Sequence, residues 1–224
     1  MRRTYLDNNA TTPLHPEVMQ VLKDSLGLFG NASSQHFFGQ EARKAVEDAR
    51  QKVATLINAK PGEIIFTSCG SESNNLVIKG VTCQDVYCKS EQSLPGKHII
   101  TSQIEHPSVM NPIKSLERQG FKVTWLPVDK YGMVDPELVE KAITKQTVLI
   151  SIMTANNEIG TIEPVAEIAR IARKHGVYFH TDAVQAVGKL NIDVQEMEVD
   201  FLSLSGHKLY APKGVAALYI RPGV

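Results

Sequence analysis

The feature that most constrains the fold is a regular alternation of short β-branched runs with segments of helical spacing. The strand-like runs occupy residues 64–67, 98–101, 122–126, 148–152, 177–180 and 201–204. Apolar residues recur every three to four positions at 107–119, 136–145 and 164–175, which is typical of amphipathic helices. Strands separated by single helices connect by right-handed crossovers. We therefore predict an α/β fold with a mostly parallel sheet flanked by helices.

Three other segments complete this prediction. The run 214–220 follows the strand at 201–204 without room for a helix, so it should pair antiparallel and make the sheet mixed. Residues 36–59 have the apolar face of a long helix, with Ser33 or Ser34 as its N-cap. The stretch 82–97 has no clear period and is predicted to be a surface loop or insertion. We expect residues 1–15 to be an N-terminal segment and residues 16–224 to form one domain.

Composition narrows the function classes. Lysine plus arginine and aspartate plus glutamate both number 24, so the chain has no net charge to attract nucleic acid or an acidic membrane. Its apolar stretches are far shorter than the roughly 20 residues that span a bilayer, and no signal peptide is evident. Cys69, Cys83 and Cys88 lack the spacing of a disulfide framework or a zinc site. We predict a cytoplasmic protein without a metal centre.

Lys208 and Asp182 are the leading catalytic candidates. Lys208 follows a buried-type strand among small hydrogen-bonding residues, although most lysines are simply solvated. Partial desolvation near a histidine should lower its pKa, and only the neutral amine attacks an aldehyde. Asp182 also ends a strand, where it is either paired, functional or the N-cap of a turn. An amine for an aldehyde and a carboxylate for a pyridinium nitrogen are what pyridoxal 5′-phosphate requires of a protein.

A phosphate site is indicated between a strand and a helix. Gly70 and Ser71 open the helix that follows the strand at 64–67, where free backbone amides bind anions. Simple capping of the helix is the alternative. Ser205 and His207, beside Lys208, could bind the same phosphate.

Three further polar residues follow strands. His106 precedes Pro107, which restricts its backbone, so its ring could stack on a cofactor and relay protons; a surface loop histidine is the alternative. Asn157, in the tandem Asn156-Asn157, could reach a ligand or belong only to a turn. Gln185 could donate to the phenolic oxygen of the cofactor. His180 is expected to be a packed histidine rather than a catalyst.

These motifs together resemble a known family, the cysteine desulfurases of the NifS/IscS type. These are aspartate aminotransferase-like, pyridoxal phosphate-dependent enzymes of the class-V aminotransferase family. The resemblance extends along the chain and rests on residues 5–12, 30–34, 66–74, 105–107, 155–161, 180–189 and 203–208. It implies that 16–224 is the cofactor-binding large domain of such an enzyme.

The resemblance also implies a role for each site residue. Lys208 would link covalently to the cofactor, Asp182 would pair with its pyridinium nitrogen and Gln185 would bond its phenolic oxygen. His106 would stack on the ring and transfer protons. Phosphate ligands would be Gly70, Ser71, Ser205 and His207, and Asn157 would lie beside the ring and the substrate.

The implied reaction converts L-cysteine to L-alanine and leaves a persulfide on a separate enzyme cysteine, for transfer to an iron–sulfur scaffold or another sulfur acceptor protein. A homodimer is implied. The family's catalytic cysteine, its substrate-carboxylate arginine and most of its small C-terminal domain are expected beyond Val224. A selenocysteine lyase, a class-V aminotransferase and a non-catalytic cofactor-binding fragment are the alternatives.

Overall fold

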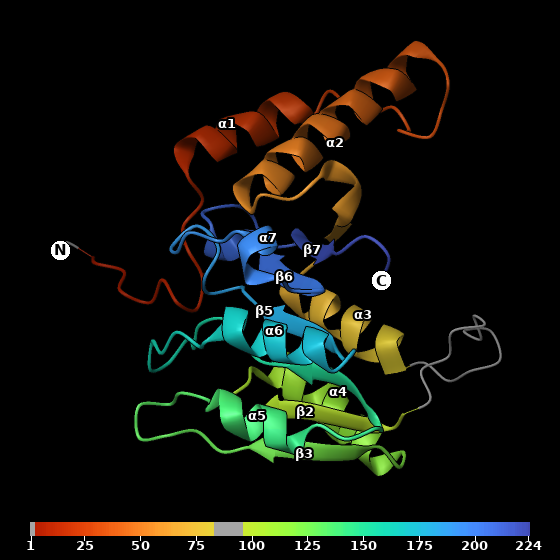
Figure 1. Ribbon diagram of the computed structural model, residues 1–224. Coiled ribbons are helices and arrows are strands. Elements are labelled where there is room, and N and C mark those ends of the chain that lie inside the picture. Colours follow the sequence, from red (N-terminus) through yellow and green to blue (C-terminus); the bar gives the residue numbers. More distant parts are fainter. Residues whose placement is uncertain (1–2, 83–95) are drawn as a thin grey trace.

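The computed structural model describes residues 3–82 and 96–224. Helices and strands alternate along most of this length, as the sequence predicts (Figure 1). The α-helices are α1 (Pro16–Ser25), α2 (Phe37–Leu56), α3 (Gly70–Thr82), α4 (Pro107–Arg118), α5 (Pro136–Ala142), α6 (Val165–Lys174) and α7 (Val194–Met197). The strands are β1 (Ile64–Thr67), β2 (His98–Ser102), β3 (Lys122–Leu126), β4 (Thr147–Ser151), β5 (Tyr178–Asp182), β6 (Phe201–Ser205) and β7 (Ala216–Ile220), and short 3-10 helices are η1 (Pro61–Glu63) and η3 (Gly206–Lys208).

The strands form one seven-stranded mixed sheet in the order β1-β7-β6-β5-β4-β2-β3. From β3 to β6 all neighbours are parallel, whereas β7 runs antiparallel to both β6 and β1. The predicted antiparallel pairing of the last strand is therefore confirmed. The parallel strands β4, β5 and β6 bring their carboxyl ends to one edge of the sheet, where the candidate site lies.

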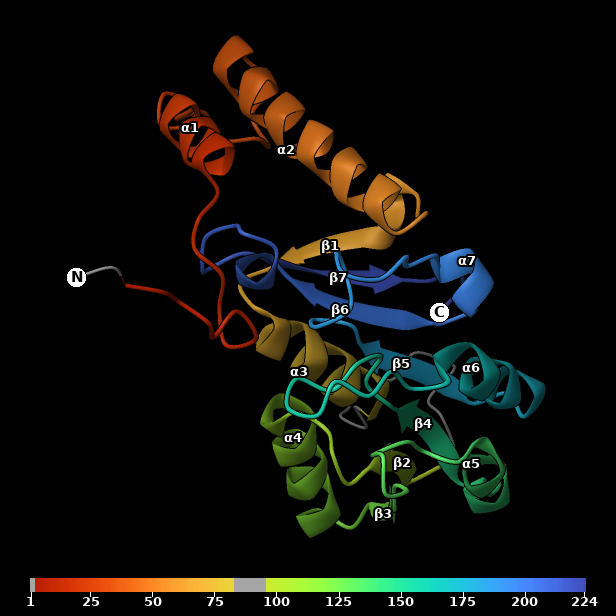
Figure 2. The ribbon, with the colours of Figure 1, turned by 90° about the vertical axis from the view of Figure 1, so that its left-hand side faces the viewer.

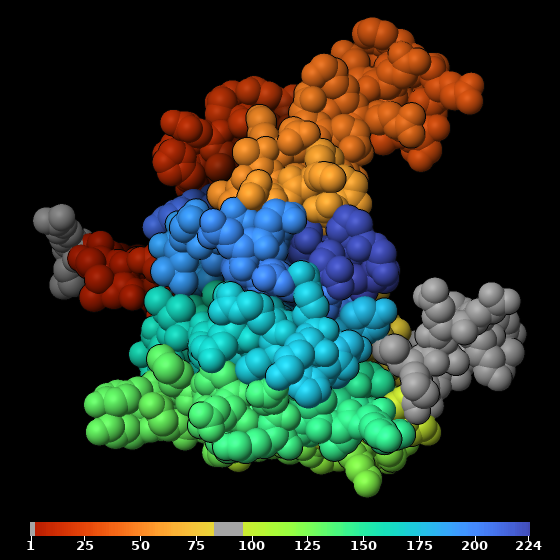
Figure 3. Space-filling model, in the orientation of Figure 1, coloured from red at the N-terminus to blue at the C-terminus, as the bar shows by residue number. Residues whose placement is uncertain are grey.

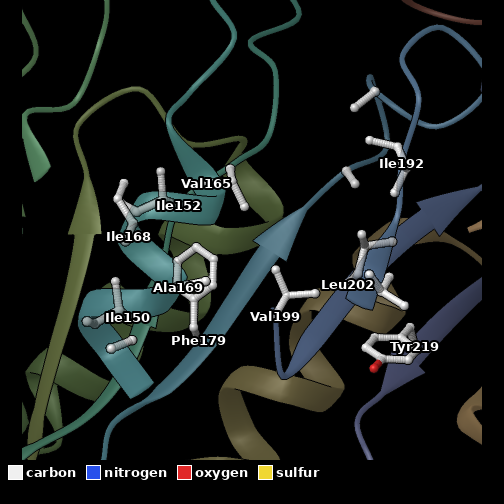
Figure 4. Close-up of a cluster of buried hydrophobic side chains, with 14 of the residues drawn as sticks. Ile150, Ile152, Val165, Ile168, Ala169, Phe179, Ile192, Val199, Leu202 and Tyr219 are labelled. Carbon is white, nitrogen blue, oxygen red and sulfur yellow. The ribbon is translucent and has the colours of Figure 1, made fainter. Parts of the chain in front are cut away.

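Two apolar cores fill the space between the sheet and its helices. Helices α3 and α4 cover one face and α5 and α6 the other (Figure 2). Because side chains alternate along a strand, Leu149 packs toward α3 and α4 while its neighbour Ile150 packs toward α6. Figure 4 shows Ile150 and Phe179 packed with Ile168 and Ala169 of α6. These contacts hold both layers against the strands that carry the site.

Helices α1 and α2 lie apart from these layers, at the β1 end of the sheet (Figures 1 and 3). Helix α1 has no buried residue, and α2 buries only Gly39, Ala42 and Ala54. The sequence predicted α2 but not α1. The predicted loop at 82–97 falls mostly on residues 83–95, which lie outside the described residues. No helix of the described residues is long and apolar enough to cross a membrane.

Candidate functional site

A cavity of about 610 Å³ opens at the carboxyl ends of the central strands. Its walls come from the start of α3, the start of α4, the loop after β4, the ends of β5 and β6, and the N-terminal segment. Every site residue predicted from the sequence lines this cavity: Gly70, Ser71, His106, Asn157, Asp182, Gln185, Ser205, His207 and Lys208. The fold thus brings together residues that are spread over most of the chain.

Lys208 lies in the 3-10 helix η3 directly after β6, and it is half-buried. Its Nζ donates hydrogen bonds to the backbone carbonyls of Asn9 and, at 2.9 Å, of Ala10. Burial lowers the pKa of Lys208, and the nearby charge of Lys189 lowers it further. A lowered pKa increases the fraction of neutral amine, which is the nucleophilic form.

Asp182 ends β5 and is buried, with 6% of its surface exposed. One carboxylate oxygen accepts from the Val184 backbone at 3.0 Å and the other from Asn74 Nδ2 at 2.7 Å. Burial raises the pKa of Asp182, while these bonds and the charges of His106 and Lys208 oppose the rise. A cation placed against this carboxyl in the cavity would favour its ionised form.

His106 forms the N-cap of α4, and its tautomer follows from its contacts. Its Nδ1 accepts a hydrogen bond from the Ser108 backbone N–H at 3.1 Å and lies 2.7 Å from Ser108 Oγ. An acceptor nitrogen carries no proton, so in the neutral ring the proton is on Nε2. Neutral His106 therefore has a proton donor at Nε2.

The start of α3 and the end of β6 form a candidate anion cradle. The first intrahelical bond in α3 runs from the Ser73 amide to the Cys69 carbonyl, so the preceding amides lack helical partners. A Cβ on Gly70 would lie 2.8 Å from Val184, so only glycine leaves this wall open. The buried Ser205 hydroxyl has no hydrogen-bond partner among the described residues. A bound phosphate would satisfy these donors.

The two tandem asparagines have different positions. Asn156 is buried, and its side chain binds the Ile104 carbonyl and the amides of Glu158 and Ile159, so it builds the turn. Asn157 lines the cavity instead, and its carbonyl accepts from Asn9. Asn156 therefore belongs to the turn, whereas Asn157 lies in the wall of the cavity.

Polar groups also lie buried beneath the site. His180 bonds Ser151 on β4 and Ser203 on β6, and burial lowers its pKa to about 3, so it is a neutral packed residue as expected. Glu105 accepts from Ser102 Oγ and the Met153 amide, and burial raises its pKa to about 8. Neutral groups of this kind tie the strand ends together without an uncompensated charge.

The N-terminal segment is part of the site, which its sequence did not reveal. Asp7, Asn9 and Ala10 line the cavity. Gln185 Nε2 donates to the Asn9 carbonyl at 2.9 Å, and Lys189 Nζ donates to Gln185 Oε1 at 2.7 Å. Backbone carbonyls make most of these contacts, so no pattern of side chains in the sequence predicts them.

His207 is held by the same segment. Thr11 Oγ1 lies 3.1 Å from its Nδ1, and Thr12 bonds its backbone carbonyl. Burial lowers the pKa of His207, with further lowering from the charges of Lys208 and Lys213. The N-terminal segment therefore orients a residue of the anion cradle as well as covering the cavity.

Asn74 and Ser108 are cavity residues that were also missed. Asn74 lies on α3 one turn after Gly70, on the face that carries Val77 and Ile78 into the core. A buried asparagine at this helical spacing is a usable signal, because an amide inside a core needs partners.

The site can be compared with known proteins. The Aminotransferase class-V family model matches residues 4–224, so the chain belongs to the class-V aminotransferase family.

Within that family the chain is similar to cysteine desulfurases. It is 56% identical to Cysteine desulfurase IscS of Dictyoglomus turgidum, over 99% of this chain and 55% of that protein. A solved NifS-like protein superposes with a TM-score of 0.93 at 42% identity, covering 100% of this chain and 60% of that one. SspA, solved in complex with cysteine, gives 0.92 at 42% identity, with 98% and 62% covered. The chain spans about half the length of the curated relatives that it matches.

Proposed function

We propose that the cavity binds pyridoxal 5′-phosphate and that Lys208 holds it covalently. The observation that carries this proposal is that an amine of lowered pKa and a buried carboxyl line one cavity of a class-V aminotransferase chain. These are the two groups through which a protein holds and activates this cofactor.

The donors in the cavity fit the remaining polar groups of the cofactor. The unpartnered Ser205 hydroxyl, the open wall at Gly70 and the free amides of α3 suit the phosphate, together with Ser71 and His207. The amide of Gln185 is proposed to bind the phenolic oxygen, and the amide of Asn157 to lie beside the ring. The protonated pyridine nitrogen of the cofactor would then compensate the negative charge of the buried Asp182 carboxylate.

When bound, the cofactor supplies an aldehyde for amines and an electron-withdrawing ring. The protein's part is to position groups and to move protons. Asp182 favours the charged state of a pyridine nitrogen placed against it. Lys208 provides the neutral amine, and His106 provides a proton at Nε2.

We further propose that the whole protein is a cysteine desulfurase, which converts L-cysteine to L-alanine and passes the sulfur through an enzyme-bound persulfide to an acceptor protein for iron–sulfur cluster assembly. The names of the relatives and the bound cysteine of SspA support this substrate. A cytoplasmic homodimer is part of the proposal. The 224-residue chain supplies the cofactor site of that enzyme.

The test is to follow alanine and sulfide formation from L-cysteine by the complete protein that contains this chain, loaded with pyridoxal phosphate. Dithiothreitol is added as the two-electron reductant that releases the persulfide sulfur as sulfide. We expect both products in equal amounts, loss of both in Lys208→Ala, and normal rates in Lys213→Ala, which changes an exposed lysine nearby. Absence of alanine formation from cysteine would reject the proposal.

The same assay separates the alternatives. Product from selenocysteine but not from cysteine indicates a selenocysteine lyase. Transfer of the amino group to a 2-oxo acid indicates an aminotransferase. Cofactor binding without turnover of any of these substrates indicates a non-catalytic protein.

A further inference from the structure

One buried amide links two groups of the site that belong to different elements. Asn74 of α3 is 0% exposed. Its Nδ2 donates both hydrogens, one to Asp182 Oδ2 at 2.7 Å and one to Ser108 Oγ at 2.8 Å. Its Oδ1 is buried without a partner among the described residues. The two bonds from Nδ2 therefore set the orientation of the amide, because, within the described part of the chain, Oδ1 makes no hydrogen bond that would hold it.

The second bond fixes the direction of the Ser108 hydroxyl. Because Ser108 Oγ accepts from Asn74, its own hydrogen is free for His106 Nδ1, which lies 2.7 Å away. That nitrogen carries no proton, and its single lone pair is shared between the Ser108 amide and the Ser108 hydroxyl. Asn74 is therefore the donor at the start of two branches, one ending on Asp182 and the other passing through Ser108 to the His106 ring.

We propose that Asn74 is a positioning residue for the cofactor site: its amide nitrogen holds the Asp182 carboxylate and, through Ser108, the His106 ring in one fixed arrangement. The inference rests on the proposed cofactor. Asn74 acts through the residues that it orients.

The effect on Asp182 has a definite sign. The ionised carboxylate accepts the Asn74 bond more strongly than the protonated carboxyl does, so this bond lowers the pKa of Asp182 against the rise caused by burial. Without the amide, the ionised carboxyl loses one of its two protein donors, and the Val184 amide remains. The carboxyl then stays protonated to a higher pH and pairs less well with a cation.

Other titrating groups face Asp182 and belong in the comparison. Protonation of His106 or of Lys208 favours its ionised form, and buried Glu105 interacts with it. All are retained in an Asn74 variant. A difference in pH dependence between an Asn74 variant and the wild type therefore reports the loss of the Asn74 amide.

The test measures, as a function of pH, the dissociation constant for pyridoxal phosphate of the complete protein that contains this chain. Asn74→Leu replaces the amide with an apolar group of similar size. We expect about tenfold weaker binding near neutral pH, and an acid limb moved about one unit upward, since one hydrogen bond to a charged group is lost. Asn74→Asp, which faces a carboxylate with another, should bind more weakly still.

Two matched variants distinguish positioning from packing. Ser108→Ala removes the other bond of the same amide but keeps the bond to Asp182, so its acid limb should move less than that of Asn74→Leu. Asn111→Leu makes the same change at an exposed position on α4 and should bind normally. Thermal unfolding of each cofactor-free variant reports the packing effect separately.

The outcomes separate this inference from the proposed function. No binding by the wild type rejects the cofactor itself. Wild-type binding with an unmoved acid limb in Asn74→Leu rejects the positioning role alone. If Asn74→Leu does not fold, Asn74→Ala removes the same bond with less volume, and the same two results apply to it.

Discussion

The strand ends around the cavity and the α1–α2 layer differ in what they bury. At the strand ends even polar side chains are enclosed: His180, Thr181 and Ser203 are 0% exposed. In the α1–α2 layer apolar side chains remain open, with Leu26 85% and Phe29 77% exposed. The site is thus fixed by contacts within the described residues, whereas α1 and much of α2 are not.

The comparison separates two kinds of residue in one chain. Near the cavity a substitution removes a packing or hydrogen-bond partner, so it should change both stability and ligand binding. In α1 and α2 most side chains have few partners to lose, so similar substitutions should be nearly neutral.

The largest effect on stability is expected in the sheet. Ile150 of β4 is 0% exposed and packs in the core that includes Ile168 and Ala169 of α6. Ile150→Ala should lower the free energy of unfolding by about 2–5 kcal/mol, because it leaves a cavity in a close-packed core. Urea unfolding followed by circular dichroism measures the change. Ile150→Val is the control, with an expected loss of about 0.5–1.5 kcal/mol; equal losses in the two variants would contradict the packing argument.

A pH-dependent effect is expected next, at Glu105. Burial raises its pKa from 4.5 to about 8, so the folded state holds a proton that the unfolded state releases. This contribution to stability is present below pH 4.5 and is lost as pH rises through about 8. Glu105→Gln should remove up to about 1.4 kcal/mol per pH unit of this dependence.

Unfolding free energies across this range provide the measurement. Asp182 and Glu163 interact with Glu105 but are unchanged in the variant, so the difference from wild type isolates the one carboxyl. Glu41→Gln, at an exposed position on α2, should run parallel to the wild type. A Glu105→Gln curve parallel to the wild type would show that this carboxyl is ionised in the fold.

The smallest effect is expected in α1. Val21 is 62% exposed on a helix without buried residues. Val21→Ser should change the free energy of unfolding by less than about 0.5 kcal/mol, since little apolar area returns to water. Its dissociation constant for pyridoxal phosphate should equal that of the wild type. A loss as large as that of Ile150→Ala would remove the distinction between the two regions.

Much of the fold is local enough to be predicted from the sequence. Each strand from β1 to β7 coincides with an apolar run of the sequence. The antiparallel direction of β7 is explained by the lack of room for a helix after β6. Helix α1 was not predicted. Its apolar residues bury nothing among the described residues, so it lacks the one-sided contact that makes helical periodicity informative.

The part of the candidate site that consists of functional side chains at strand ends was predictable from the sequence. Asp182 ends a strand and Lys208 and His106 come within four residues of a strand end, so the sheet topology brings the three together. The Asn74 bonds depend on how closely α3 approaches α4 and β5, which is a tertiary property. The contacts of Asn9 use backbone carbonyls, which every residue has.

The most direct test of the account is to find the lysine that binds the cofactor. The complete protein that contains this chain is incubated with pyridoxal phosphate, reduced with borohydride and mapped by mass spectrometry of its peptides. We expect the reduced adduct on Lys208, its loss in Lys208→Ala and its retention in Lys213→Ala. An adduct on another lysine, undiminished in Lys208→Ala, would contradict the assignment of the cavity.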